Sequence, residues 1–298
     1  MTIPHRVHIH LGAHKTATTF IQNCLEQNKS LFLDRHILCV TPTFTRNGFM
    51  KCFRESIAGN AENQAELTEK MLAFIKAETL SYGFNDSQPT LLVISEENFL
   101  GNFKSLIENG RLYPELKLRL ATLAKTFDGC EISVFVSIRH YCEFYPSAYL
   151  EALRNGVHRM SFEEFMANAT ILENSWLTMI DDICSVFDTV KVWPYEKFRE
   201  NAQAILSELL DTPLSKEIID INTLQRPSLS RKGLDIVMAN KDKLSRLELT
   251  RLVDLIADQM VFDDPVEKLK ITDQWLIDRL NTQYQADLNK LSRYLIVK

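Results

Sequence analysis

Five short apolar segments alternate with helical segments along this chain, and that alternation restricts the fold to few classes. The apolar segments lie near residues 7–11, 36–41, 90–95, 132–138 and 189–193. The segment at 90–95 is almost continuously apolar, which is typical of a strand buried on both faces of a parallel sheet. Strands that alternate with helices form such a sheet with helices on both sides. The sequence therefore predicts an α/β fold built on a five-stranded parallel sheet.

The chain beyond residue 200 is mostly helical in its periodicity. Helices are expected near residues 246–260 and 272–294, and the second repeats its apolar residues at three-to-four spacing, which predicts packing against a core or a partner. No internal repeat and no low-complexity linker divides the sequence. We therefore expect a single domain over residues 1–298, with a core up to about residue 200 and a helical portion over residues 201–298.

Composition excludes several classes of protein. The chain is 45% hydrophobic and 24% charged, and its net charge of −5 offers no overall attraction to nucleic acid or to an anionic membrane. No apolar run approaches the roughly 18 residues that a membrane span needs. The six cysteines include no C-x-x-C pair, and the first residues lack the apolar core of a signal peptide. A reduced, cytoplasmic protein is the expectation.

The segment Gly12-Ala-His-Lys-Thr-Ala-Thr-Thr19 comes after the first apolar segment and leads into an expected helix. Backbone N–H groups at a helix N-terminus, threonine hydroxyls and a lysine ammonium all favour an anion. A nucleotide P-loop, G-x-x-x-x-G-K-[ST], placed on Gly12 requires glycine at Ala17 and lysine at Thr18. The lysine lies three positions earlier, at Lys15. The segment thus predicts an anion site that differs from the ordinary nucleotide loop, and a solvated, threonine-rich helix start is the structural alternative.

Polar side chains also come after two other apolar segments. Glu96 and Glu97 stand directly after residues 90–95, at the edge of the sheet where ligands bind in α/β proteins. Either carboxylate is a candidate general base, and the alternative is that they cap the next segment. Arg139 ends the segment at 132–138, and Ser147 comes later in an expected helix. A guanidinium and a hydroxyl near a helix N-terminus are suitable donors to a phosphate.

Together these motifs resemble the sulfotransferases that use 3′-phosphoadenosine 5′-phosphosulfate (PAPS). The segment at 12–19 is similar to their G-x-x-K-[ST]-G-T-T loop, with Ala17 in place of glycine. Arg139 with Ser147 is similar to their 3′-phosphate site. The resemblance implies a P-loop-like, three-layer fold and transfer of a sulfuryl group to a hydroxyl or amine. If residue 17 requires a positive φ, alanine there costs roughly 1 kcal/mol.

The resemblance also implies the partners of the reaction and the role of each residue. The acceptor would be a small molecule or a carbohydrate, the product 3′,5′-adenosine diphosphate, and no metal would be required. Lys15 would stabilise the leaving phosphate, and Glu97, favoured over Glu96 by a serine–x–glutamate–asparagine pattern, would accept the acceptor's proton. Phe20 and Tyr195 would contact the adenine, with core packing as the alternative for both. The expected donor-binding residues are Gly12, Ala13, His14, Lys15, Thr16, Ala17, Thr18, Thr19, Phe20, Arg139, Ser147 and Tyr195.

Several assignments stay open at this level. Residues 44–64 lack a clear period and are interpreted as a long loop, either over the substrate or on the surface, and residues 100–111 are a second loop that could read the acceptor. Arg231-Lys232-Gly233 is similar to the family's basic 3′-phosphate segment, although a solvated helix start is preferred. A non-catalytic nucleotide-binding protein and an ATP-dependent small-molecule kinase remain alternative functions. The sequence does not indicate an oligomeric state.

Overall fold

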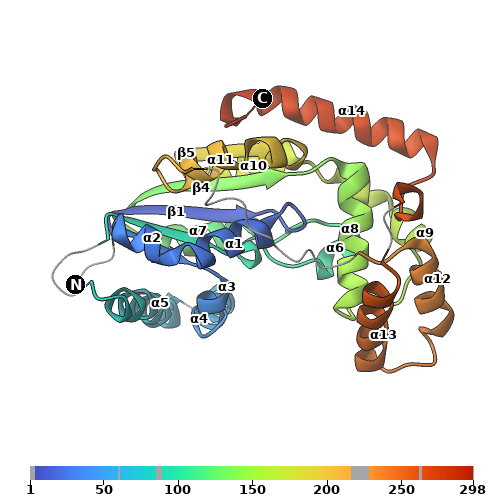
Figure 1. Cartoon of the computed structure of the whole chain (residues 1–298), viewed down its shortest axis with the longest axis horizontal. Coiled ribbons are helices and arrows are strands. Elements are labelled where there is room, and N and C mark those ends of the chain that lie inside the picture. The colour runs from blue at the N-terminus through green and yellow to red at the C-terminus, as the bar shows by residue number, and fades with distance from the viewer. Residues whose placement is uncertain (1–3, 60, 85–88, 216–227, 262–263, 298) are drawn as a thin grey trace.

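The computed structural model describes residues 4–59, 61–84, 89–215, 228–261 and 264–297 (Figure 1). Five strands form one sheet in the order β2-β3-β1-β4-β5, and every pairing in it is parallel. The predicted α/β fold with a five-stranded parallel sheet between helices is confirmed. The strands are β1 (Arg6–Gly12), β2 (Ile37–Val40), β3 (Leu91–Ser95), β4 (Glu131–Ile138) and β5 (Thr189–Pro194).

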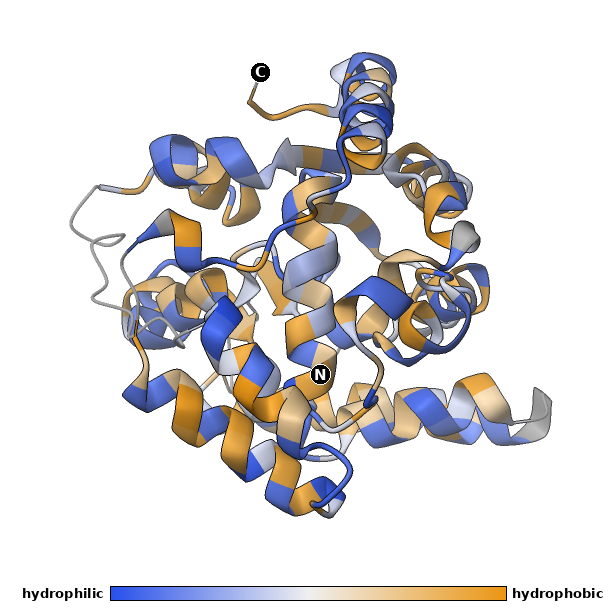
Figure 2. Ribbon diagram, turned by 90° about the vertical axis from the view of Figure 1, so that its right-hand side faces the viewer, coloured by the Kyte–Doolittle hydropathy of each residue, from blue (hydrophilic) through white to orange (hydrophobic). Residues whose placement is uncertain are grey.

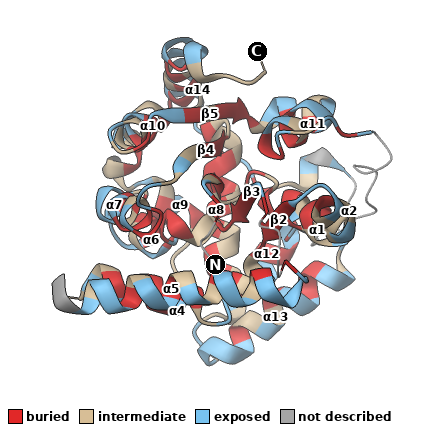
Figure 3. Cartoon of the chain, turned by 90° about the vertical axis from the view of Figure 1, so that its left-hand side faces the viewer, coloured by how far each residue is buried: buried red, intermediate tan, exposed pale blue. Residues whose placement is uncertain are grey.

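Side chains alternate along each strand and so build two apolar cores, one on each face of the sheet. In β1, Val7 and Ile9 point into the larger core, whereas His8 and His10 share the opposite face. The smaller core lies under α1 (Thr18–Gln27), α2 (Lys29–Asp34) and α11 (Tyr195–Leu209). The larger core lies under α4 (Phe49–Ala58), α5 (Ala61–Ser81), α7 (Leu116–Thr126) and α10 (Trp176–Cys184), as Figure 3 shows from one end.

Helix α8 (Tyr141–Arg154) stands across the ends of the strands rather than along the sheet, as Figure 1 shows. The helices α12 (Arg231–Asn240) and α13 (Arg246–Gln259) pack together, and α13 rests on α8. Figure 2 views this end of the molecule and shows hydrophilic and hydrophobic residues alternating along the exposed helices. The strand ends therefore face a wall made by α8 rather than open solvent.

Helix α14 (Gln274–Lys290) is attached to α8 and α10 through a buried carboxylate. Asp287 accepts hydrogen bonds from the Tyr141 hydroxyl at 2.6 Å, the Ser175 hydroxyl at 3.0 Å and the Trp176 backbone N–H at 3.0 Å. Three donors satisfy a buried carboxylate that would otherwise be costly to remove from water. The packing predicted for this helix from its apolar spacing is confirmed.

Two segments expected to be loops are helical. Residues 42–58 form α3 (Pro42–Thr45) and α4, and α6 (Lys104–Asn109) lies within the expected loop at 100–111. Phe49 and Phe53 are fully buried one helical turn apart, so the segment does have a helical period, although polar residues between them obscure it. The prediction of a long loop at 44–64 was therefore wrong.

The remaining short elements connect these layers. Helix α9 (Phe162–Met166) begins with a capping box, in which Ser161 and Glu164 bond reciprocally. Arg231 and Lys232 open α12 as exposed residues and pair with Glu163 and Glu267, so this segment is a solvated helix start in the structure. Residues 216–227, which come before this segment, lie outside the described residues. The 3₁₀ turns are η1 (Glu97–Phe99), η2 (Ala169–Glu173), η4 (Pro265–Glu267) and η5 (Ser292–Tyr294).

Across the described ranges, no helix combines the length and the apolar character that a membrane crossing needs.

Candidate active site

Adjacent strands bring the segments singled out in the sequence to one edge of the sheet. The loop over residues 12–19 comes after β1, and β1 lies between β3 and β4. Glu97 comes after β3, Arg139 after β4, and Tyr195 after β5, which is the next strand beyond β4. Because parallel strands end at the same edge, these residues meet although they are far apart in sequence.

The loop after β1 folds tightly against Glu97. Gly12 has φ +94°, and a Cβ there would lie 3.1 Å from both Glu97 Cβ and Thr18 Cγ2. Only glycine accommodates that backbone conformation together with that close approach. The Thr16 hydroxyl donates to the Ala13 carbonyl at 2.5 Å, so it closes the loop on itself rather than facing outward.

The N-terminus of α1 is open to an anion. Ala17 precedes the helix in a left-handed conformation, with φ 65°, and no described side chain caps the helix or places an acid in its first turn. The first N–H groups of a helix have no acceptor within it, and they carry the positive end of its dipole. Thr18 is buried and Thr19 is exposed. The Phe20 ring packs edge-on against Phe198, with centroids 5.5 Å apart.

Ala17 adopts the conformation that the resemblance assigns to a glycine. In the left-handed region, alanine destabilises the folded protein by about 1 to 2 kcal/mol. Glycine avoids this strain, but the greater freedom that it gives the unfolded chain lowers the free energy of unfolding by about 0.4 to 1 kcal/mol. We expect Ala17→Gly to raise the free energy of unfolding by about 0.5 to 1 kcal/mol in urea titrations. Ala202→Gly, inside helix α11, is the matched control and should lower it by about 1 kcal/mol. A destabilised Ala17→Gly protein would contradict this account.

Lys15 is bound through both its side chain and its backbone. Its ammonium lies 3.0 Å from Glu151 Oε2 on α8, and its backbone carbonyl accepts a hydrogen bond from Arg139 Nη1 at 2.8 Å. Residue 15 also has a positive φ, of 65°. These contacts orient the lysine within the loop.

Arg139 lies between the loop and Tyr195. Its guanidinium stacks over the Tyr195 ring at 4.5 Å from the centroid, and its Nη2 lies 3.7 Å from a Glu143 carboxylate oxygen. Its Nε is buried and has no hydrogen-bond partner among the described residues. Ser147 stands one helical turn after Glu143 and so lies on the same face of α8. Arg139 thus contacts both Lys15 and Tyr195, while Phe20 packs separately against α11.

Glu97 is an ionised carboxylate with two polar partners. Gln22 Nε2 donates to Oε2 at 2.7 Å, and Arg46 Nη2 lies 2.8 Å from Oε1. Burial alone would raise the pKa of Glu97, but the charge of His14 and these two partners hold the pKa below its ordinary value. Burial lowers the pKa of His14, so its imidazole is charged only in acid solution, and near neutral pH Gln22 and Arg46 are the partners that keep the Glu97 carboxylate ionised.

Glu96 has a different role. Its carboxylate is fully buried and accepts hydrogen bonds from the Thr45 hydroxyl at 2.5 Å and from the backbone N–H and the side-chain amide of Asn98. Arg46 Nη2 lies 3.3 Å from it. Glu96 is therefore the cap of η1, whereas Glu97 is the carboxylate beside Gly12.

His14 belongs to the wall of the site. Its Nδ1 lies 2.8 Å from the Tyr113 hydroxyl, and its ring contacts Phe103 at a centroid distance of 4.9 Å. Over the described ranges, no group of three or more histidine, cysteine, aspartate or glutamate side chains is placed to hold a metal ion.

Glu151, Gln22 and Arg46 were not assigned to the site from the sequence. Glu151 lies one helical turn after Ser147, and that spacing is the one local signal that could have placed it there. Gln22 and Arg46 carry no comparable signal, because their contact with Glu97 joins segments that come after three different strands.

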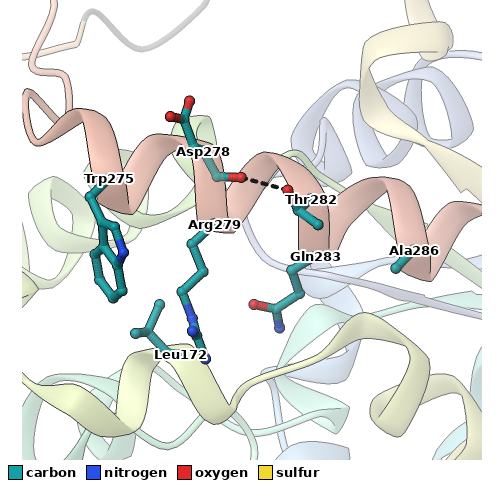
Figure 4. Close-up of a pocket in the computed structure, with 7 residues that line it drawn as sticks. All are labelled: Leu172, Trp275, Asp278, Arg279, Thr282, Gln283 and Ala286. Atoms are coloured by element: carbon teal, nitrogen blue, oxygen red, sulfur yellow. Dashed lines mark hydrogen bonds between the residues drawn. The ribbon is translucent and has the colours of Figure 1, made fainter.

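A separate surface pocket lies between α14 and η2, as Figure 4 shows, with a volume of about 550 Å³. Leu172, Trp275 and Arg279 line it, and the Arg279 guanidinium lies 5.7 Å from the Trp275 ring centroid. None of its lining residues belongs to the segments at the strand ends. The candidate active site is therefore defined by converging side chains and not by this hollow.

The sheet order and the flanking helices define a parallel α/β fold. No protein-family model matches this chain, and no curated protein matches it. Among solved structures, the chain is similar to the crystal structure of a sulfotransferase from Alicyclobacillus acidocaldarius. The two are 14% identical, with a TM-score of 0.44, and the match covers 83% of this chain and 95% of the other. A likeness this distant leaves the activity to be inferred from the residues of the site.

Proposed function

We propose that this protein is a sulfotransferase that transfers the sulfuryl group of PAPS to a hydroxyl or amine of a small-molecule or carbohydrate acceptor. The observation that supports it most is the hydrogen bond of 2.8 Å from Arg139 Nη1 to the Lys15 carbonyl. This bond joins two motifs that lie 124 residues apart, and each resembles one half of the donor site of PAPS-dependent enzymes. A single resembling motif would support the proposal far less.

The residues present fit such a donor. Gly12 lets the loop fold closely against Glu97, and the uncapped N-terminus of α1 offers N–H groups to the 5′-phosphosulfate beside Lys15. Arg139 and Ser147 would hold the 3′-phosphate, for which the buried Nε of Arg139 is an unused donor among the described residues. Tyr195 would contact the adenine. To bind phosphate, Lys15 and Arg139 would have to exchange their carboxylate partners on α8 for it.

The chemical roles derive from charge and position. When bound, the donor supplies an activated sulfuryl group whose S–O bond to phosphate breaks as the acceptor oxygen or nitrogen bonds to sulfur. Lys15 and the loop N–H groups would stabilise the negative charge that develops on the departing phosphate oxygen. Glu97, which is ionised near neutral pH, would take the proton that the acceptor loses.

Nucleotide binding tests the proposal. We expect 3′,5′-adenosine diphosphate to bind at least tenfold more tightly than 5′-adenosine diphosphate in calorimetric titrations, because a charge-assisted phosphate contact contributes about 1.5 to 3 kcal/mol. Arg139→Ala should remove this preference. Arg35→Ala is the matched control, because Arg35 is exposed and bonds to Thr212, away from the loop.

Transfer of labelled sulfuryl from PAPS to a panel of alcohols, phenols, amines and sugars completes the test. Tight binding without transfer to any acceptor would favour the non-catalytic alternative. ATP binding that exceeds binding of the 3′-phosphorylated nucleotide, and that is unchanged in Arg139→Ala, would favour a kinase instead.

A further inference from the structure

The two cations that would bind the donor, Lys15 and Arg139, both face carboxylates of the same helix. Lys15 Nζ lies 3.0 Å from Glu151 Oε2, and Arg139 Nη2 lies 3.7 Å from Glu143 Oε2. Glu143, Ser147 and Glu151 recur at four-residue spacing along α8, so they share one face. The face that carries the proposed phosphate hydroxyl thus also carries two negative charges.

The contact at Lys15 is the stronger of the two. Glu143 is shared with Lys268, whereas Glu151 binds Lys15 directly and uses its other oxygen to accept from Asn155 at 3.2 Å. The side chains of Lys15 and Glu151 are only 31% and 22% exposed. Burial would raise the pKa of Glu151, but the charge and hydrogen bond of Lys15 hold it below the ordinary value. The carboxylate is therefore ionised near neutral pH, and the chain itself neutralises Lys15.

We propose that Glu151 is an internal counter-ion for Lys15, so that an oxyanion reaching the loop must displace this carboxylate before Lys15 can bind it. The inference rests on the proposed function, in which the displacing group is the phosphosulfate of the donor. Glu151 is a positioning residue here: it directs the ammonium across the loop towards α8 and weakens anion binding by competition and by like-charge repulsion. We expect the loop, α1 and Lys15 to stay in place when Glu151 is replaced, because Glu151 contacts only the ammonium of this lysine there.

Inorganic sulfate is the probe, titrated calorimetrically into the full chain. We expect Glu151→Gln to bind sulfate about tenfold more tightly than the wild-type protein, because the competing charge is gone while the side-chain shape is kept. Glu151→Asp, which retains the charge on a shorter side chain, should gain less. The matched control is Glu208→Gln. It removes the same charge from Glu208 of α11, whose Oε1 lies 2.8 Å from Lys191 Nζ. This control should bind sulfate as the wild-type protein does.

A double variant shows whether the gain acts through Lys15. The increase should vanish when Glu151→Gln is combined with Lys15→Ala, whereas a general charge effect would persist. Sulfate binding that is unchanged or weaker in Glu151→Gln overturns the inference, as does a gain that Glu208→Gln reproduces.

The same titrations with 3′,5′-adenosine diphosphate separate this inference from the proposed function. If sulfate binding rises in Glu151→Gln but the 3′-phosphorylated nucleotide is never preferred over 5′-adenosine diphosphate, the counter-ion stands and the PAPS-dependent function fails. If that nucleotide is preferred but Glu151→Gln binds sulfate no more tightly than the wild-type protein, the proposed function stands and the counter-ion role of Glu151 is wrong.

Discussion

Lys15→Ala is expected to lower the rate of sulfuryl transfer by about 10³-fold or more while the protein stays folded. Loss of one donor aimed at developing charge lowers catalytic rates by about 10² to 10³, and a full positive charge is lost here. Stability should change by no more than about 1 kcal/mol, because the ion pair with Glu151 is partly exposed to water. The rate with labelled PAPS, alongside a urea unfolding curve, measures both effects.

The control for Lys15→Ala is Lys191→Ala, which breaks another ion pair of similar length far from the loop. It should leave transfer unchanged. Full turnover by the Lys15→Ala protein would rule out the proposed role of this lysine, and an unfolded variant would show that the loop is structural.

Acidification from pH 7.5 to pH 5.0 is expected to destabilise the protein through its buried histidines, and His10 should contribute about 2 kcal/mol. The imidazole of His10 is fully buried in β1, next to the Ser95 hydroxyl and stacked on Trp193. Burial lowers the pKa of His10 from 6.5 to about 4. Below pH 6.5 the unfolded chain therefore binds a proton that the native protein excludes until about pH 4, so stability falls as pH is lowered through this window.

Urea unfolding at several pH values measures this contribution. Between pH 7.5 and pH 5.0, the free energy of unfolding of His10→Gln should fall by about 2 kcal/mol less than that of the wild-type protein. This difference is expected whatever the stability of the variant at pH 7.5. His5→Gln is the matched control and should leave the pH dependence unchanged, because the His5 side chain is exposed in the native protein. Equal losses in the wild-type and His10→Gln proteins would contradict the assignment.

The strands could be predicted closely, and the reason is local. Each is a short apolar run between polar or turn-forming residues, and burial on both faces leaves little ambiguity in the pattern. The helix α4 was missed because its period depends on which of its residues face the core. Phe49 and Phe53 fit a helix, but polar residues such as Lys51 and Arg54 mask that spacing until tertiary packing shows which face is inside.

The approximate place of the site could also be predicted from sequence. Parallel strands bring the segments after them to one edge, so the loop at Lys15, the carboxylate at Glu97 and the guanidinium at Arg139 were expected near one another. The sequence pattern already favoured Glu97 over Glu96, and the coordinates add what each carboxylate contacts. Both come after the same strand, and the structure separates them because one turns inward to cap η1 while the other lies against Gly12.

Sequence was thus sufficient for what depends on neighbours along the chain: the strands, the helices near residues 246–260 and 272–294, and the loop of residues 12–19. The left-handed backbone at Ala17 could be suspected from its place in that loop, and the structure shows it. The partners of the charged groups came only from tertiary structure. Lys15 and Glu151 are 136 residues apart, and their contact depends on how α8 crosses the strand ends. The sequence shows which side chains are charged. Tertiary packing decides which of them come together, such as Lys15 and Glu151 at 3.0 Å.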